Sequence, residues 1–225
     1  MTAYGAFFIY IPGMTTTSFR IKAATLLCLA SGIGGAAEPA PRVDAIYLAA
    51  RHIGYAGKLV DARRVDDRDG EHLLVLSRKA SPSQMQNSDS DEDYLELAAT
   101  YYGNRDGRWR VEWTVRDNVD CPVLDHNAEF FLSDISITDL NHDGRSEVTI
   151  PYKLFCSGGV DYSTVKVILR EGATKLAIRG ELEFHDHAPA LQGKRQYDAA
   201  LLQPANAAYK RHMDAIWKTI ARRRE

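Results

Sequence analysis

Apolar and polar residues alternate along much of the chain, a period typical of half-buried β-strands. Three pairs of alternating segments each flank a turn that contains glycine, which predicts hairpins. The pairs are residues 58–65 with 72–77, 94–102 with 109–116, and 163–170 with 175–184. A fourth pair, residues 130–138 and 148–155, is rich in β-branched and aromatic residues. The sequence therefore predicts a mainly β (α+β) fold, an antiparallel meander of about eight strands arranged as a sandwich or a propeller-like sheet.

Helical spacing replaces this alternation near both ends of the predicted sheets. Residues 43–53 carry apolar side chains at helical intervals before Gly54, so a short helix is expected there. A longer helix is expected after Pro204 and Asn206, with an apolar face formed by Tyr209, Met213, Ile216, Trp217 and Ile220. Its opposite face is basic. Such a helix can lie on a membrane, but docking onto a sheet is the more frequent arrangement and is predicted here.

The stretch between the segments of the fourth pair carries oxygen-bearing side chains at alternate positions. Asp139, Asn141, Asp143 and Glu147 occupy positions 1, 3, 5 and 9 of a loop with glycine at position 6. The carbonyl of Arg145, at position 7, adds another oxygen, and Ca²⁺ takes about six to eight oxygen ligands. The loop resembles the nine-residue calcium loops of integrin-type β-propeller repeats. A plain Asp-Gly turn with solvated acids is the alternative, and a structural Ca²⁺ held by these five residues is predicted.

The first 37 residues have the composition of a secretory signal. Arg20 and Lys22 precede an uncharged run that ends in small residues, so cleavage after Ala37 is expected. Met14 is a second possible start of translation, because the residues before it add an apolar patch that a signal does not need. A membrane anchor is the competing interpretation, but 15 uncharged residues are too few to span a bilayer comfortably. The protein is therefore expected in the periplasm or outside the cell.

Removal of the signal would leave residues 38–225, expected as a single β-rich domain. The chain has 28 basic and 30 acidic residues, and loss of Arg20 and Lys22 leaves 26 basic residues and a net charge of −4. Nucleic acid is not expected as a partner, because its binding calls for a basic stripe.

Two cysteines remain after the signal, Cys121 and Cys156. In an oxidising compartment an even pair predicts a disulfide. The bridge would close a loop of roughly 35 residues and stabilise the fold by about 3–4 kcal/mol in the chain-entropy model. That loop encloses the calcium stretch.

Two further acidic stretches are weaker candidates for metal sites. Glu181, Glu183, His185 and His187 alternate, so in a strand they would share one face, and such a set suits Zn²⁺. The preferred interpretation is a solvated strand end, because a proline and a glycine soon follow and indicate a loop. Residues 80–93 are polar and acidic but irregularly spaced, and are expected to form a surface loop.

The sequence offers little support for catalysis. It contains no Gly-x-Ser-x-Gly elbow, no His-Glu-x-x-His pair and no phosphate-binding loop. Ser157-Gly158-Gly159 is interpreted as a turn. Asp161 and Glu171 could be imagined as the paired carboxylates of a glycosidase, but their spacing does not favour this over surface charge. The sequence leans against an enzyme without deciding the question.

A family resemblance is carried by several stretches after residue 120. They are Asp120-Cys121-Pro122, residues 135–148 with the calcium loop, Tyr152-Lys153-Leu154-Phe155-Cys156, residues 166–172, and Lys175-Leu176-Ala177-Ile178-Arg179-Gly180. The chain resembles a family of small exported bacterial proteins catalogued under surface polysaccharide biosynthesis. The resemblance covers roughly residues 57–220 and implies a role in envelope glycan production. It brings no reaction and no catalytic residues.

These observations predict an exported, calcium-stabilised, non-catalytic accessory protein of the cell envelope. It would support surface polysaccharide production or bind an envelope glycan or protein. The alternatives are an envelope hydrolase, with His185 and His187 in its site, and a periplasmic inhibitor or partner-binding module. A binding module is expected to expose aromatic side chains such as Trp109, Trp113 or Tyr162 on an open face.

Overall fold

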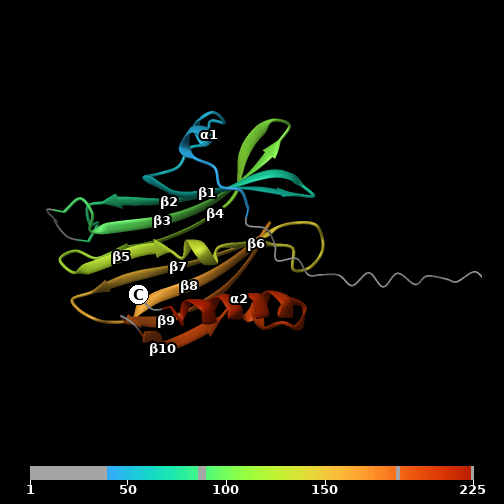
Figure 1. The fold of residues 1–225 in the computed structure, drawn as a ribbon. Helices are drawn as coiled ribbons and strands as arrows, with labels where there is room; N and C mark the ends of the chain where they lie inside the picture. The colour runs from blue at the N-terminus through green and yellow to red at the C-terminus, as the bar shows by residue number, and fades with distance from the viewer. Residues whose placement is uncertain (1–39, 86–89, 186–187, 224–225) are drawn as a thin grey trace, which may run out of the picture. The chain divides into compact units, whose positions relative to one another are not determined.

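A computed structural model describes residues 40–85, 90–185 and 188–223. The predicted signal segment and His187 lie outside these ranges. Two antiparallel sheets make up most of the described chain, with a short helix before them and a longer helix after them (Figure 1). This confirms the expected mainly β class, with ten strands where about eight were expected.

The first sheet is a meander of four strands in the order β1-β2-β3-β4. Its strands are β1 Lys58–Asp67, β2 Gly70–Ser81, β3 Tyr94–Arg105 and β4 Arg108–Asp120. They form the two hairpins that the sequence predicts: β1 and β3 begin where expected, and the other strand ends extend by one to four residues. Residues 68–69 and 106–107 make the tight turns, where Asp106 and the glycines Gly70 and Gly107 have positive φ.

The second sheet has six strands in the order β10-β9-β8-β7-β5, and β6 also pairs with β7. The strands are β5 Asp125–Phe130, β6 Ser136–Thr138, β7 Glu147–Ser157, β8 Ser163–Glu171, β9 Thr174–His185 and β10 Ala188–Tyr197. Two expectations were wrong. Residues 130–138 are not one strand but two, separated by the 3-10 turn Leu132–Asp134. The segment after His185, expected as a loop, returns as β10.

Proline explains the first of these corrections. Pro151 lies in β7 between the residues that pair with β6 and those that pair with β5. Because proline has no N–H to donate, the partner strand is interrupted opposite it. Phe131 leaves the sheet there and donates a 3.0 Å hydrogen bond to the Pro151 carbonyl.

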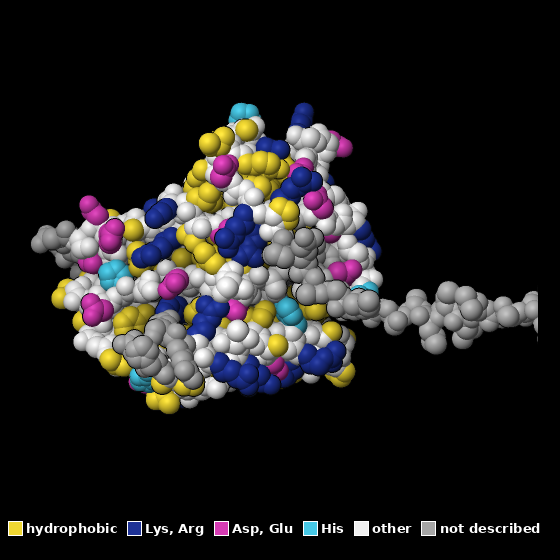
Figure 2. All heavy atoms as spheres, in the orientation of Figure 1, with side chains coloured by type: hydrophobic (Ala, Val, Ile, Leu, Met, Phe, Trp, Pro, Cys, Tyr) yellow, Lys and Arg dark blue, Asp and Glu magenta, His cyan; other side chains and the backbone are white. Residues whose placement is uncertain are grey.

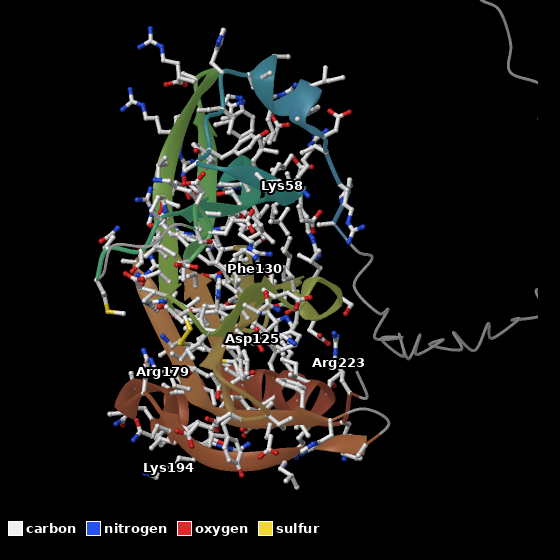
Figure 3. The ribbon with its side chains drawn as sticks, turned by 90° about the vertical axis from the view of Figure 1, so that its left-hand side faces the viewer. Lys58, Asp125, Phe130, Arg179, Lys194 and Arg223 are labelled. Atoms are coloured by element: carbon white, nitrogen blue, oxygen red, sulfur yellow. A yellow bond between two sulfur atoms is a disulfide. The ribbon has the colours of Figure 1, made fainter. Side chains whose placement is uncertain are left out.

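The two sheets pack face to face as a sandwich. Their inner faces share one apolar core, which includes Leu74, Leu97, Tyr101 and Trp113 from the first sheet and Phe130, Ile150, Tyr152 and Ile168 from the second. Figure 3 shows Phe130 between the two sheets. Of the two arrangements expected, the sandwich is therefore the one observed.

Each helix covers the outer face of one sheet. Helix α2, Ala207–Ile220, buries Tyr209, Met213, Trp217 and Ile220 against the second sheet, which confirms its predicted docking. Lys and Arg side chains gather over α2 along the lower part of the molecule in Figure 2. No helix in the described ranges is long and apolar enough to cross a membrane.

Helix α1 covers the first sheet but is shorter than expected, and its buried face differs in part from the predicted one. It spans only Ala45–Ala49 and begins at Asp44, whose side chain accepts a 2.8 Å hydrogen bond from the Tyr47 N–H. Leu48 and Ile53 are buried against the sheet, whereas Ile46 is 78% exposed. The predicted apolar face of residues 43–53 is therefore only partly correct.

Antiparallel strands place successive connections at opposite ends of the sandwich. The turn end carries the connections after β1, β3 and β8 and the loop Asp139–Ser146 between β6 and β7. The disulfide end carries the connections after β2, β4 and β7. There Cys121 and Cys156 form the predicted disulfide, with their Cα atoms 5.8 Å apart (yellow bond in Figure 3). In Figure 1 the turn end lies to the right.

Candidate functional site

The calcium-loop stretch folds back on itself at the turn end. Asp139 Oδ1 accepts a hydrogen bond from the Asp143 N–H and Oδ2 accepts one from the Gly144 N–H, both 3.0 Å. Asn141 Oδ1 also accepts from the Asp143 N–H, and Asp143 Oδ1 accepts from the Arg145 N–H at 2.8 Å. The side chains at positions 1, 3 and 5 are thus turned toward the loop's own backbone and hydrogen-bond to it.

Two residues of the loop need a left-handed backbone. Gly144 has φ +83° and His142 has φ +59°. A Cβ at Gly144 would also lie 3.1 Å from the Cδ atom of Arg68. The positive φ favours glycine at position 6, and a Cβ there would also crowd the Arg68 side chain of the neighbouring hairpin.

Glu147, at position 9, anchors the loop from inside the protein. Its side chain is fully buried, and Oε2 accepts hydrogen bonds from Thr138 Oγ1 at 3.1 Å and from the Leu140 N–H at 2.8 Å. Burial raises the pKa of this carboxyl, and the donated hydrogen bonds oppose that rise. Oε1 has no hydrogen-bond partner among the described residues.

This donor set fits a hard cation. A buried carboxylate oxygen without a donor is satisfied by a bound Ca²⁺, which takes carboxylate, amide and carbonyl oxygens together. Within the described ranges, no three His, Cys, Asp or Glu side chains are grouped so as to hold a metal. A Ca²⁺ here would therefore also use the Asn141 amide and the Arg145 carbonyl, and its binding stays a prediction.

The β1–β2 turn packs against the loop from the first sheet. Asp67 Oδ2 accepts a 2.9 Å hydrogen bond from the Ser146 N–H, and the Arg68 N–H donates one of 2.9 Å to the Gly144 carbonyl. The Arg68 side chain donates to the Asp143 carbonyl, and Arg145 Nε lies 2.9 Å from an oxygen of Asp69. The loop therefore joins the two sheets at this end.

Glu171 holds the loop from the other side. Its Oε1 accepts a 3.2 Å hydrogen bond from Asn141 Nδ2, and its Oε2 accepts one of 2.8 Å from Tyr209 Oη in α2. Sequence reasoning considered Glu171 only as a possible paired carboxylate and missed its contacts with the loop, as it missed those of Asp67, because these partners are 30 or more residues away along the chain. No local pattern marks such contacts.

The other predicted site residues are only partly brought together. His185 Nε2 lies 3.2 Å from Glu183 Oε1 but makes no hydrogen bond, and Glu181 Oε2 accepts one of 3.2 Å from the Lys194 N–H of β10. With His187 outside the described ranges, the zinc hypothesis stays untested. Asp161 and Glu171 lie near opposite ends of β8, too far apart to act as paired carboxylates.

The disulfide end exposes apolar side chains on two loops. Val123 is 89% exposed and Val160 81%, on the connections after β4 and β7. The disulfide joins Cys121, at the start of the first connection, to Cys156 near the end of β7, and a Cβ at Gly158 would lie 3.6 Å from Leu124 Cδ2. Val123 also has φ +74°, which is strained for a β-branched residue.

The aromatic side chains named as binding candidates are distributed unequally. Trp113 is buried and stacks on Tyr101, Trp109 is partly buried, and Tyr162 is 40% exposed beside Val160 at the disulfide end. Of the three, only Tyr162 is in a position to meet a partner.

Comparisons of the chain with protein-family models, with curated proteins and with solved structures find no match.

Proposed function

We propose that this chain is an exported, non-catalytic binding protein of the cell envelope, stiffened by calcium, with its partner surface at the disulfide end. The observation that carries the proposal is the pair of exposed apolar loops there. Isolated exposed apolar residues are ordinary, but here Val123, Leu124, Val160 and Tyr162 occur on two connections beside one disulfide, which joins the first connection to the end of β7.

The backbone at Val123 supports a binding role. A β-branched residue at positive φ costs on the order of 1–3 kcal/mol, and such strain persists only where the surroundings hold it. Here the neighbouring Cys121 is 1% exposed and covalently fixed to β7. The disulfide thus holds an apolar side chain out in solvent, where burial against a partner would stabilise it by about 1.5–3 kcal/mol.

The apolar character of these loops favours a protein as the partner over a glycan. Aliphatic side chains make no hydrogen bonds with sugar hydroxyls, whereas they fill apolar pockets on protein surfaces. If the protein partner is an enzyme, this binding function would be that of an inhibitor. The role in surface polysaccharide production rests on the sequence resemblance alone.

Charged substitutions at the loop tips test the proposal. Immobilised protein with Val123→Asp and Val160→Asp should fail to retain a partner that the unchanged protein retains from an envelope extract. Ile46→Asp is the matched control, because Ile46 is also exposed (78%) but lies on α1. Retention that survives the loop substitutions, or that is equally lost with Ile46→Asp, would rule out this surface.

The polysaccharide role has its own test. Deletion of the gene should change the pattern of surface polysaccharide on a gel, and a plasmid copy should restore it. An unchanged pattern would remove that role while leaving the binding surface to be judged by the retention experiment.

A further inference from the structure

A cavity of about 350 Å³ opens at the turn end, beside the calcium loop. Its walls come from both sheets: His72 and Tyr101 on the inner face of the first sheet, and Arg145, Arg170 and Glu171 from the second. It lies at the opposite end of the sandwich from the disulfide loops.

Three polar atoms of the cavity wall lack hydrogen-bond partners within the described ranges. They are Tyr101 Oη, Arg170 Nε and His72 Nδ1, the last of which lies 3.6 Å from an oxygen of Asp67 without a hydrogen bond. His72 is 3% exposed and Tyr101 is 4% exposed, so solvent cannot readily substitute for the missing partners. Buried polar groups are normally satisfied, and a cluster of exceptions around one cavity points to a ligand that supplies the partners.

The rings are held in fixed positions. His72 stacks on Tyr101 at 5.0 Å between ring centroids, and Tyr101 stacks on Trp113 at 4.9 Å. The guanidinium carbon of Arg170 lies 5.3 Å over the Trp113 ring. The polar atoms are therefore pre-positioned and need little ordering when a ligand enters.

The charges around the cavity determine which ligand it fits. Arg105 pairs with Glu112 at 2.8 Å and Arg145 with Asp69 at 2.9 Å. Arg170 donates to the Gly172 carbonyl at 2.9 Å but pairs with no carboxylate in the described part of the chain. Burial lowers the pKa of Arg170.

The acidic side chains of the wall already have partners. Asp67 accepts from the Ser146 and Asp69 N–H groups, and Glu171 accepts from Asn141 and Tyr209. With Asp69 and Glu112, these make four acids against three arginines in the wall. A ligand with one negative charge suits Arg170, whereas a second negative charge would be repelled.

We propose that this cavity binds a small organic monoanion that carries a carboxylate and neighbouring hydroxyl groups. The carboxylate accepts a hydrogen bond from the Arg170 Nε–H, and the hydroxyl groups satisfy Tyr101 Oη and His72 Nδ1. A free hydroxy acid and the terminal acidic sugar of a glycan share this chemistry. The site goes beyond the proposed function, because it uses neither the disulfide loops nor their partner.

Titration calorimetry with chosen probes tests the site. D-gluconate and D-glucuronate should bind the full chain saturably, and D-glucose and inorganic phosphate should bind at least about tenfold more weakly, because the first lacks the carboxylate and the second carries too much charge. Methyl β-D-glucuronoside separates the two sources: its binding points to a glycan terminus, and its failure beside gluconate binding points to a free acid.

Three single variants assign the binding to the cavity. Arg170→Gln should weaken D-glucuronate binding by about tenfold or more, and Arg110→Gln, an exposed arginine of β4 outside the cavity, should not change it. Tyr101→Phe should weaken binding while leaving the unliganded protein at least as stable, because it removes a hydroxyl that has no partner.

The results that would overturn the site are equally definite. No saturable binding of either sugar acid, or equal losses in the Arg170 and Arg110 variants, would refute it. The Val123→Asp, Val160→Asp protein should keep full D-glucuronate affinity, so that failure of the loop surface and failure of the cavity can be told apart.

Discussion

Tyr209 in α2 donates a 2.8 Å hydrogen bond to Glu171 at the end of β8, and the other oxygen of Glu171 accepts from Asn141 in the loop between β6 and β7. The covering helix and the candidate metal loop are thus joined through one carboxylate. Burial and this hydrogen bond to the carboxylate raise the pKa of the Tyr209 hydroxyl, so it stays protonated as the donor at neutral pH.

Tyr209→Phe should therefore affect both stability and calcium. We expect a loss of about 1–2 kcal/mol in the free energy of unfolding and a several-fold weaker Ca²⁺ affinity, because Glu171 and Asn141 lose their restraint. Tyr197→Phe is the control: it removes a 2.7 Å hydrogen bond to Asp214 of the same helix without reaching the loop. Denaturant unfolding and Ca²⁺ titration of both variants check this, and equal calcium affinities would contradict the coupling.

Calcium itself should raise the melting temperature of the unchanged protein relative to chelator. At a Ca²⁺ concentration about 100 times the Kd, the expected stabilisation is about 2.7 kcal/mol. Asp143→Asn removes a charged ligand and should abolish most of the shift. Asp106→Asn changes an aspartate in the same position before a glycine, in a turn without the other ligands, and should leave the shift intact. A shift that is absent, or equal in all three proteins, would show that the loop is only a turn.

The disulfide should contribute about 3–4 kcal/mol to the free energy of unfolding, because it closes a long loop of the unfolded chain. The double variant Cys121→Ser, Cys156→Ser should unfold at correspondingly lower denaturant concentration. Unchanged protein in reductant provides the matched comparison. A double variant as stable as the oxidised protein would mean that the bridge constrains the loops without stabilising the fold.

Local signals account for what the sequence predicted well. Each hairpin combines alternation with a glycine-containing turn, and both signals occur within about 20 residues. The face of α2 is equally local, since Tyr209, Met213 and Trp217 recur at helical spacing. Prediction of the disulfide from the two cysteines needed only the further assumption of an oxidising compartment.

Features that depend on residues far away along the chain could not be predicted from the local sequence. Pro189 and Gly193 indicated a loop, yet β10 is an edge strand, where proline is tolerated. Gly193 is favoured because a Cβ there would lie 2.8 Å from the Cβ of Glu181 on β9. The wall of the cavity is formed by residues up to about 100 positions apart, such as His72 and Arg170. No local sequence motif therefore predicts the cavity.

Arg63 illustrates such a long-range contact and supports another prediction. It is 7% exposed, pairs with Asp61, and donates hydrogen bonds to the Leu132 and Ile135 carbonyls at 2.7 and 3.0 Å. Arg63→Met should lower the free energy of unfolding by about 3–5 kcal/mol, because it leaves the buried Asp61 without its closest partner. Arg64→Met, at the neighbouring and more exposed position, should cost about 1 kcal/mol or less in the same denaturant measurement. Comparable losses in the two variants would be inconsistent with this role.

His212 should make stability depend on pH. Its Nε2 lies 2.8 Å from Ser136 Oγ, and burial lowers its pKa below the ordinary 6.5. Between that lowered value and 6.5 the unfolded chain binds more protons than the folded chain, so stability should fall as the pH drops below about 6.5. His212→Gln should flatten this part of the profile, whereas His52→Gln, at an exposed position after α1, should not. Unfolding free energies measured at several values between pH 5 and 7.5 decide it, and parallel profiles for the two variants would exclude His212 as the cause.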